Sequence, residues 1–185
     1  MSNELGGVTN RSIRDSIGDR AFTVGVLAVD GTNVENVQTT AAVVHTINGV
    51  FQTDYPATAE IDLSAVAVIS AKDGASLAAP VAMPALAAGA DPETKCYILA
   101  CKGATAYIVE PELTNASQDK SDHPLTCPAG YAPFGLIKVV HTPTSAAGVA
   151  AFTLGVDDLT GITNRAASFF DIAVVPPTVA SIVKT

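Results

Sequence analysis

The chain has 185 residues, of which 48% are hydrophobic, 15% charged and 5% aromatic, and its formal net charge is −8. This length suits a single domain with a sizeable core. The acidic balance and the scattered Lys and Arg residues, which form no basic stripe, argue against a nucleic-acid-binding protein. The most apolar run, residues 75–90, contains two prolines and is too short to span a bilayer, so no membrane partner is expected.

Residues 1–20 are interpreted as an N-terminal arm. The segment is polar and lacks the apolar core of a secretory signal, so we expect the protein to be made in a cytoplasm. Asn10 is a possible cap of a short helix that carries Ile13 and Ile17 on one face. A helix this short is marginal alone and must dock, either on its own domain or on a partner. In the second alternative the anchoring residues are Arg11, Ile13, Arg14, Ile17 and Arg20.

Residues 21–185 show the alternation and turn signals of one β domain. Strands are expected over 21–30 and 61–70, and between them Asn48-Gly49 is the preferred dipeptide of a type I′ hairpin turn. The segment at about 75–93 is rich in alanine and broken by three prolines. It is expected to cross over the domain body in extended form.

The second half of the chain continues the β pattern. Strands are expected over 96–102, 105–110, 134–141 and 168–175, with a polar loop over 111–124. In the strand 134–141, simple alternation places Phe134 on the same face as Leu136 and Lys138. Short strands at this spacing predict an all-β fold, an antiparallel sandwich or a barrel-like domain with an extended N-terminal arm.

The three cysteines do not form a convincing metal site or disulfide. Cys96 and Cys101 are five residues apart on one predicted strand, so they face opposite sides of the sheet and cannot grip one zinc ion. Cys127 lies in a loop and can meet either of them. A reduced cytoplasm nevertheless favours three free thiols.

Other reactive groups are equally isolated in sequence. His45 and His141 lie in predicted strands among valines, and the pair Asp157-Asp158 lacks the spaced oxygen ligands that calcium requires. Neither a nucleophile elbow nor a glycine-rich phosphate loop is present. We therefore expect no enzyme, no catalytic residues, no cofactor and no metal.

From about residue 40 to the C-terminus, the order of motifs resembles the capsid decoration, or head cement, proteins of tailed bacteriophages. The resemblance is carried by the hairpin Ile-Asn-Gly-Val-Phe at 47–51, the strand at 97–100 and the Pro-Ala-Gly entry at 128–130. It continues through Phe-Thr-Leu-Gly at 152–155 and Asp-Leu-Thr-Gly at 158–161.

The resemblance implies a virion structural protein on the outer capsid surface, bound to the major capsid protein and commonly a homotrimer. It brings no catalytic residues with it. Two alternatives stay open, a tail or baseplate component and a β-rich carbohydrate-binding adhesin module. The adhesin would normally show exposed aromatic residues, whereas this chain has no Trp and only four dispersed Tyr.

Overall fold

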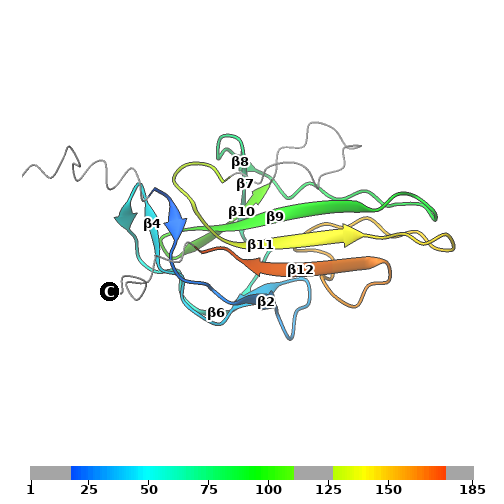
Figure 1. Ribbon diagram of the computed structural model, residues 1–185, viewed down its shortest axis with the longest axis horizontal. Helices are drawn as coiled ribbons and strands as arrows, with labels where there is room; N and C mark the ends of the chain where they lie inside the picture. The colour runs from blue at the N-terminus through cyan, green and yellow to red at the C-terminus, as the bar shows by residue number, and fades with distance from the viewer. Residues whose placement is uncertain (1–17, 111–126, 174–185) are drawn as a thin grey trace, which may run out of the picture.

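The computed structural model describes residues 18–110 and 127–173. Within these ranges the chain forms strands and no helix, which confirms the all-β fold. The strands form three open sheets, and none of the three closes into a barrel (Figure 1). Most of the predicted arm, residues 1–17, lies outside the described residues, as do the predicted loop 111–124 and the end of the last predicted strand.

The largest sheet has six strands in the order β12-β11-β9-β10-β7-β8. Its long central strands, β9 (Glu93–Lys102) and β11 (Ala132–His141), lie side by side and antiparallel (Figure 1). The outer strands are β12 (Arg165–Asp171), β10 (Thr105–Glu110), β7 (Ala67–Ser70) and β8 (Ser76–Leu77). One neighbouring pair, β10 and β7, is parallel, so the sheet is mixed rather than purely antiparallel.

Two small sheets pack against one face of the large one. The first contains β1 (Arg20–Ala21), β4 (His45–Ile47) and β5 (Val50–Phe51), and the second contains β2 (Leu27–Val29), β3 (Val37–Thr39) and β6 (Thr58–Ile61). Buried side chains of both small sheets share one hydrophobic cluster with the large sheet. The fold is therefore sandwich-like, and the core lies between the small sheets and the large one.

The Asn48-Gly49 hairpin is confirmed. Asn48 has φ 50° and Gly49 has φ 69°, the two positive values that a type I′ turn requires. The turn connects β4 to β5, which pair antiparallel from Ile47 and Val50 onward. A short local signal was sufficient to predict it because both turn residues tolerate the left-handed region.

Two predicted strands are each divided between sheets. The stretch 21–30 is broken between β1 and β2, where Val26 has φ 55°. The stretch 61–70 is broken after β6, where the Asp62 carboxylate accepts hydrogen bonds from the backbone and side chain of Ser64 in a turn. Alternation of apolar residues continues across both breaks, because the chain passes from one sheet to another that covers the same core.

The prediction that Phe134 shares a face with Leu136 is wrong. The pairing of β11 with β9 shifts register between Pro133 and Gly135, so Phe134 is an extra residue in a β-bulge. The bulge turns Phe134 into the core, where its ring stacks on Tyr55 with centroids 5.1 Å apart. One inserted residue moves Phe134 to the opposite face from the one that simple alternation gives it. The local sequence contained no signal from which we predicted the bulge.

The crossover segment begins with β8 and then runs antiparallel to a later part of the chain. Met83 forms a bridge with Phe152, and Leu86 forms another with Val149. Met83, Phe152 and Leu154 belong to the main core cluster, so the crossover and residues 149–154 together cover one end of the large sheet. The extended form expected from the prolines is what the structure shows.

Candidate interaction surface

The folded domain begins at Gly18 and Asp19, called the Asp19 corner below, where both residues make hydrogen bonds to distant parts of the chain. Asp19 Oδ1 accepts a hydrogen bond from the Asn48 N–H at 2.5 Å, and its Oδ2 accepts one from the Gly130 N–H at 2.5 Å. The preceding carbonyl, that of Gly18, accepts hydrogen bonds from the Gly49 N–H and the Thr46 hydroxyl. The point where the arm meets the domain is thus fixed to both the hairpin and the loop before β11.

Only one of the five predicted anchoring residues lies among the residues that the structure describes. Arg20 lies in β1, opposite Thr46 of β4, and its side chain is exposed. The other four, Arg11, Ile13, Arg14 and Ile17, lie outside the described residues. Because Asp19 and Arg20 belong to the folded domain, the domain starts earlier than residue 21.

An exposed aromatic patch lies beside the corner. Arg20, Thr46 and Phe51 are successive partners across the first small sheet, so their side chains share one face, on which Thr46 itself is buried. Phe51 is 66% exposed, and its ring lies 5.7 Å from that of Phe22. The set Arg20, Phe22 and Phe51, called the hairpin patch below, combines two aromatic rings with one positive charge. Sequence reasoning used Phe51 only as part of a motif and missed Phe22.

A shallow groove of about 500 Å³ lies between the turn after β6 and the strands β7 and β10. Among the described residues, Asp62 is the only charged one that lines this groove, which is called the Asp62 groove below. Hydrogen bonds from Ser64 lower the pKa of the Asp62 carboxyl, which therefore stays ionised at neutral pH. The apolar part of the lining includes Tyr55, Ile61, Val66, Ala106 and the ring of Tyr107.

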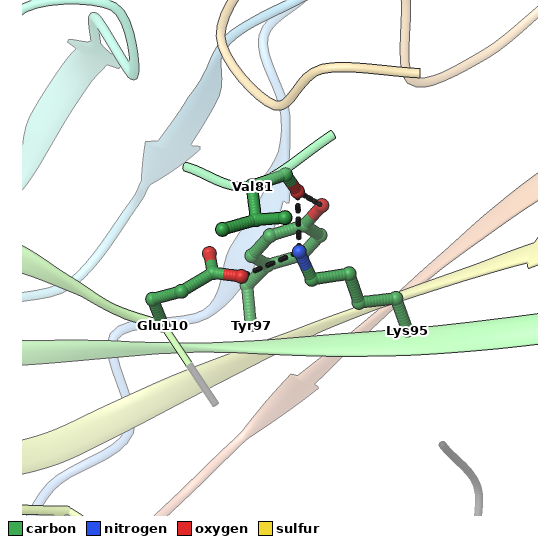
Figure 2. Close-up of polar contacts among 4 residues, drawn as sticks. All are labelled: Val81, Lys95, Tyr97 and Glu110. Atoms are coloured by element: carbon green, nitrogen blue, oxygen red, sulfur yellow. Dashed lines mark hydrogen bonds and ion pairs between the residues drawn. The ribbon is translucent and has the colours of Figure 1, made fainter. Parts of the chain in front are cut away.

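A buried ion pair lies under the crossover (Figure 2). Lys95 Nζ is 2.5 Å from Glu110 Oε1, and both side chains are 3% exposed. Lys95 also donates to the Val81 carbonyl oxygen and lies over the ring of Tyr97, 4.7 Å from its centroid. Burial raises the pKa of Glu110, and the charge of Lys95 opposes that rise. The ion pair joins β9 to β10, and the hydrogen bond from Lys95 to Val81 attaches the crossover to them.

A second polar cluster joins β11 to β12. Arg165 Nε donates to His141 Nε2 at 3.3 Å, and the guanidinium lies 4.8 Å from the ring centroid of Phe152. Arg165 also donates to the carbonyl oxygens of Ala150 and Ala151. Burial and the charge of Arg165 lower the pKa of His141, so this imidazole is neutral and accepts the hydrogen bond. The cluster holds the loop before β12 against the large sheet.

The cysteines are placed as their spacing predicted. Cys101 is buried in the main core, whereas Ile98 and Ala100, which have the same phase as Cys96, belong to a cluster on the opposite face. All three cysteines are free thiols in the structure. Burial raises the pKa of Cys101 and Cys127 to about 12, so neither thiol is activated as a nucleophile.

Among residues 18–110 and 127–173, no three His, Cys, Asp or Glu side chains gather in an arrangement that could hold a metal ion. In the same ranges, no helix has the length and apolar character needed to cross a membrane. Comparisons of the chain with protein-family models, with curated proteins and with solved structures found no match.

Proposed function

We propose that the chain is a virion structural protein that decorates and stabilises an assembled tailed-phage capsid by binding its outer surface, without catalysis. The observation that carries the proposal is the rigid corner at Asp19, where the arm enters the domain beside the exposed hairpin patch. The choice of a phage capsid as the partner rests on the order of sequence motifs, which resembles that of capsid decoration proteins. The partners are the major capsid protein and further copies of the same chain, in a homotrimer.

The corner suits an anchor because an arm transmits binding only if its attachment point is fixed. Asp19 ties the first described residues to two separate backbone segments, so an arm bound to a shell would hold the whole domain in one orientation. Docking Ile13 and Ile17 would gain about 1.5–3 kcal/mol for each side chain. Ordering the arm consumes much of that gain, so several copies must act together.

Charged residues in and next to the arm would add to the anchoring. Arg11 precedes Ile13, Arg14 lies between Ile13 and Ile17, and Arg20 is exposed at the edge of the domain. Together they would form charge-assisted contacts with an acidic shell surface. The buried charged groups, by contrast, hold internal segments together: Lys95 and Glu110 join β9 to β10, and Arg165 fastens the loop before β12.

The tyrosines bear on the adhesin alternative. Tyr55 and Tyr97 are buried in the core, and Tyr107 and Tyr131 are half-buried and meet edge to face with centroids 4.9 Å apart. Sugar-binding platforms usually present an open aromatic face, which this edge-to-face pair does not offer but the exposed ring of Phe51 does, so the adhesin alternative has to be tested. A glycan array tests this alternative directly, and the capsid proposal expects no specific signal on it.

The test of the proposal uses empty shells assembled from the major capsid protein of the same genome. The full chain should co-sediment with the shells, and cryo-electron microscopy should place it on their outer surface. A chain that lacks residues 1–17 should keep its melting temperature and oligomeric state but should no longer co-sediment with the shells. The truncation must stop there, because a cut after Arg20 would also remove Asp19 and destabilise the domain.

A matched control tests whether the two isoleucines dock the arm. Ile13→Ser together with Ile17→Ser should abolish co-sedimentation, whereas Ser12→Ala and Ser16→Ala in the same segment should leave it unchanged. If the chain without residues 1–17 binds shells with full occupancy, the arm is not the anchor. If the full chain does not bind shells at all, the capsid proposal fails.

A further inference from the structure

We infer that the protein associates with itself head to tail, and that the hairpin patch of one copy fills the Asp62 groove of a second copy. This inference deepens the proposed function, because it assigns the contact that would build the homotrimer. It needs no capsid, however, and its test is carried out on the isolated protein.

The hairpin patch has the composition of an interface anchor. Phe51 is 66% exposed, and it is supported at its side by the ring of Phe22. Val50, its neighbour in β5, is also exposed but pairs with Ile47 and so lies on the other face, outside the patch. Aromatic residues that protrude from a surface beside an arginine are the residue types that contribute most to protein interfaces.

The patch is rigid before it binds. Phe51 pairs with Thr46 in the small sheet, and the type I′ turn fixes the tip of the hairpin. Asp19 accepts a hydrogen bond from the first turn residue, Asn48, and so holds the tip to the loop before β11. Little conformational freedom is therefore lost when Phe51 is inserted into a partner, which favours binding.

The Asp62 groove is complementary in size and character. Its volume is about 500 Å³, and it is shallow and open to solvent, so a protruding ring can reach its apolar lining. Val66 and Ala106 provide an apolar wall, and Tyr55 is held from below by its stacking on Phe134. The groove therefore belongs to the packed core region and does not have to form on binding.

The charges at the two surfaces are of opposite sign. Arg20 is the charged residue of the hairpin patch, and Asp62 is the single charged residue that lines the groove within the described part of the chain. Ser64 holds the Asp62 carboxylate through hydrogen bonds of 2.6 Å from its hydroxyl and 3.0 Å from its N–H. An arginine from a second copy would meet an acceptor that is already oriented.

A second copy of the chain can serve both surfaces, because each copy carries a patch that fits the groove and a groove that fits the patch. The patch and the groove use different residues, so the contact between two copies is heterologous and leaves one free patch and one free groove at the ends. Such a contact closes into a ring when the rotation between copies permits it. A ring of three copies would place the three Asp19 corners, and with them the three arms, in equivalent positions.

The test mixes two variants that are each defective at one surface. Phe51→Ser removes the patch and keeps the groove. Ala104→Lys places a long positive side chain at an exposed position of the groove and keeps the patch. In size-exclusion chromatography with light scattering, the wild type should be a trimer and each variant alone should be a monomer. An equimolar mixture should form a dimer of one copy of each, because it contains one intact contact and cannot grow further.

A charge exchange tests the same contact independently. Arg20→Glu and Asp62→Lys should each weaken association at least tenfold, and the double variant should recover most of the loss. Both positions are exposed, so thermal melts should show that all variants stay folded. A wild type that remains monomeric at high concentration would overturn the inference. So would a Phe51→Ser variant that remains trimeric, or a mixture of the two variants that contains no mixed dimer.

The two proposals fail in different ways. A protein that forms trimers by this contact but does not bind shells would leave the self-association intact and remove the capsid function. A protein that binds shells as a monomer through its arm would support the capsid function and overturn the self-association.

Discussion

Asp19 and Gly130 are joined by a hydrogen bond of 2.5 Å between the Asp19 carboxylate and the Gly130 N–H, although 111 positions separate them in the sequence. The other oxygen of the same carboxylate binds the Asn48 N–H. One side chain therefore connects the start of the folded domain, the hairpin tip and the approach to β11. Gly130 has φ +88°, and this conformation brings its N–H to the carboxylate.

Replacement of Asp19 by Ala should destabilise the domain. Two backbone N–H groups lose their acceptor, and because the Asn48 site is exposed and the Gly130 site only part-buried, water replaces part of the loss and each bond contributes about 0.5–1.5 kcal/mol. Asp19→Asn keeps one acceptor oxygen and should cost less. Urea unfolding followed by circular dichroism measures both, with Asp54→Ala, an exposed aspartate after the same hairpin, as the control. Equal midpoints for Asp19→Ala and Asp54→Ala would show that the corner contributes nothing.

The ion pair between Lys95 and Glu110 should show strong coupling. Lys95→Met leaves a buried carboxylate without its partner, and breaking a buried pair in this way costs about 3–5 kcal/mol. The double variant Lys95→Met/Glu110→Leu removes both charges and should be more stable than Lys95→Met alone. A double-mutant cycle of unfolding free energies gives the coupling. Additive effects of the two substitutions would mean that the two side chains do not stabilise each other.

The sequence was informative wherever the signal is local. The hairpin at Asn48-Gly49 was predicted because two adjacent residues determine the turn. The opposite faces of Cys96 and Cys101 were predicted because β9 runs without interruption between them. Both results depend on neighbours along the chain and on nothing that folds back from a distance.

The features that escaped prediction all depend on distant parts of the chain. The bulge at Phe134 exists because the ring fits against Tyr55, which comes from the other side of the core. The Lys95–Glu110 pair depends on the crossover that covers it. The groove is formed by segments that only the sheet order brings together. Of the predicted anchoring residues, Arg20 alone lies among those the structure describes.

Two glycines with the same backbone conformation should respond very differently to alanine. Gly155 has φ +78° and Gly161 has φ +77°, so an alanine at either position would be strained by about 1–2 kcal/mol, a cost that glycine avoids. A Cβ at Gly155 would lie 2.6 Å from the Leu63 carbonyl carbon and 2.7 Å from the Ser64 nitrogen, whereas a Cβ at Gly161 would meet nothing within 4 Å. Gly155→Ala should therefore lower the melting temperature well beyond Gly161→Ala. Similar melting temperatures for the two variants would contradict the close approach of the two backbones.

The stability of the domain should depend on pH through His141. Burial and the charge of Arg165 lower its pKa in the folded state below the ordinary value of 6.5. Below pH 6.5 the unfolded chain therefore takes up a proton at this position before the folded chain does, and protonation favours unfolding. The contribution is fully present above pH 6.5 and is lost as the pH falls from there through the lowered pKa of the folded state.

His141→Gln removes this titration and keeps a polar side chain beside Arg165. Urea midpoints measured for both proteins from pH 8 down to pH 5, about the range in which histidines titrate, give the difference. The wild type should lose stability relative to His141→Gln as the pH falls through this range, because only the wild type has the imidazole that the unfolded chain protonates. A difference between the two proteins that stays constant with pH would show that His141 titrates alike in the folded and unfolded states. In that case Arg165 and the buried setting would not disfavour the charged imidazole.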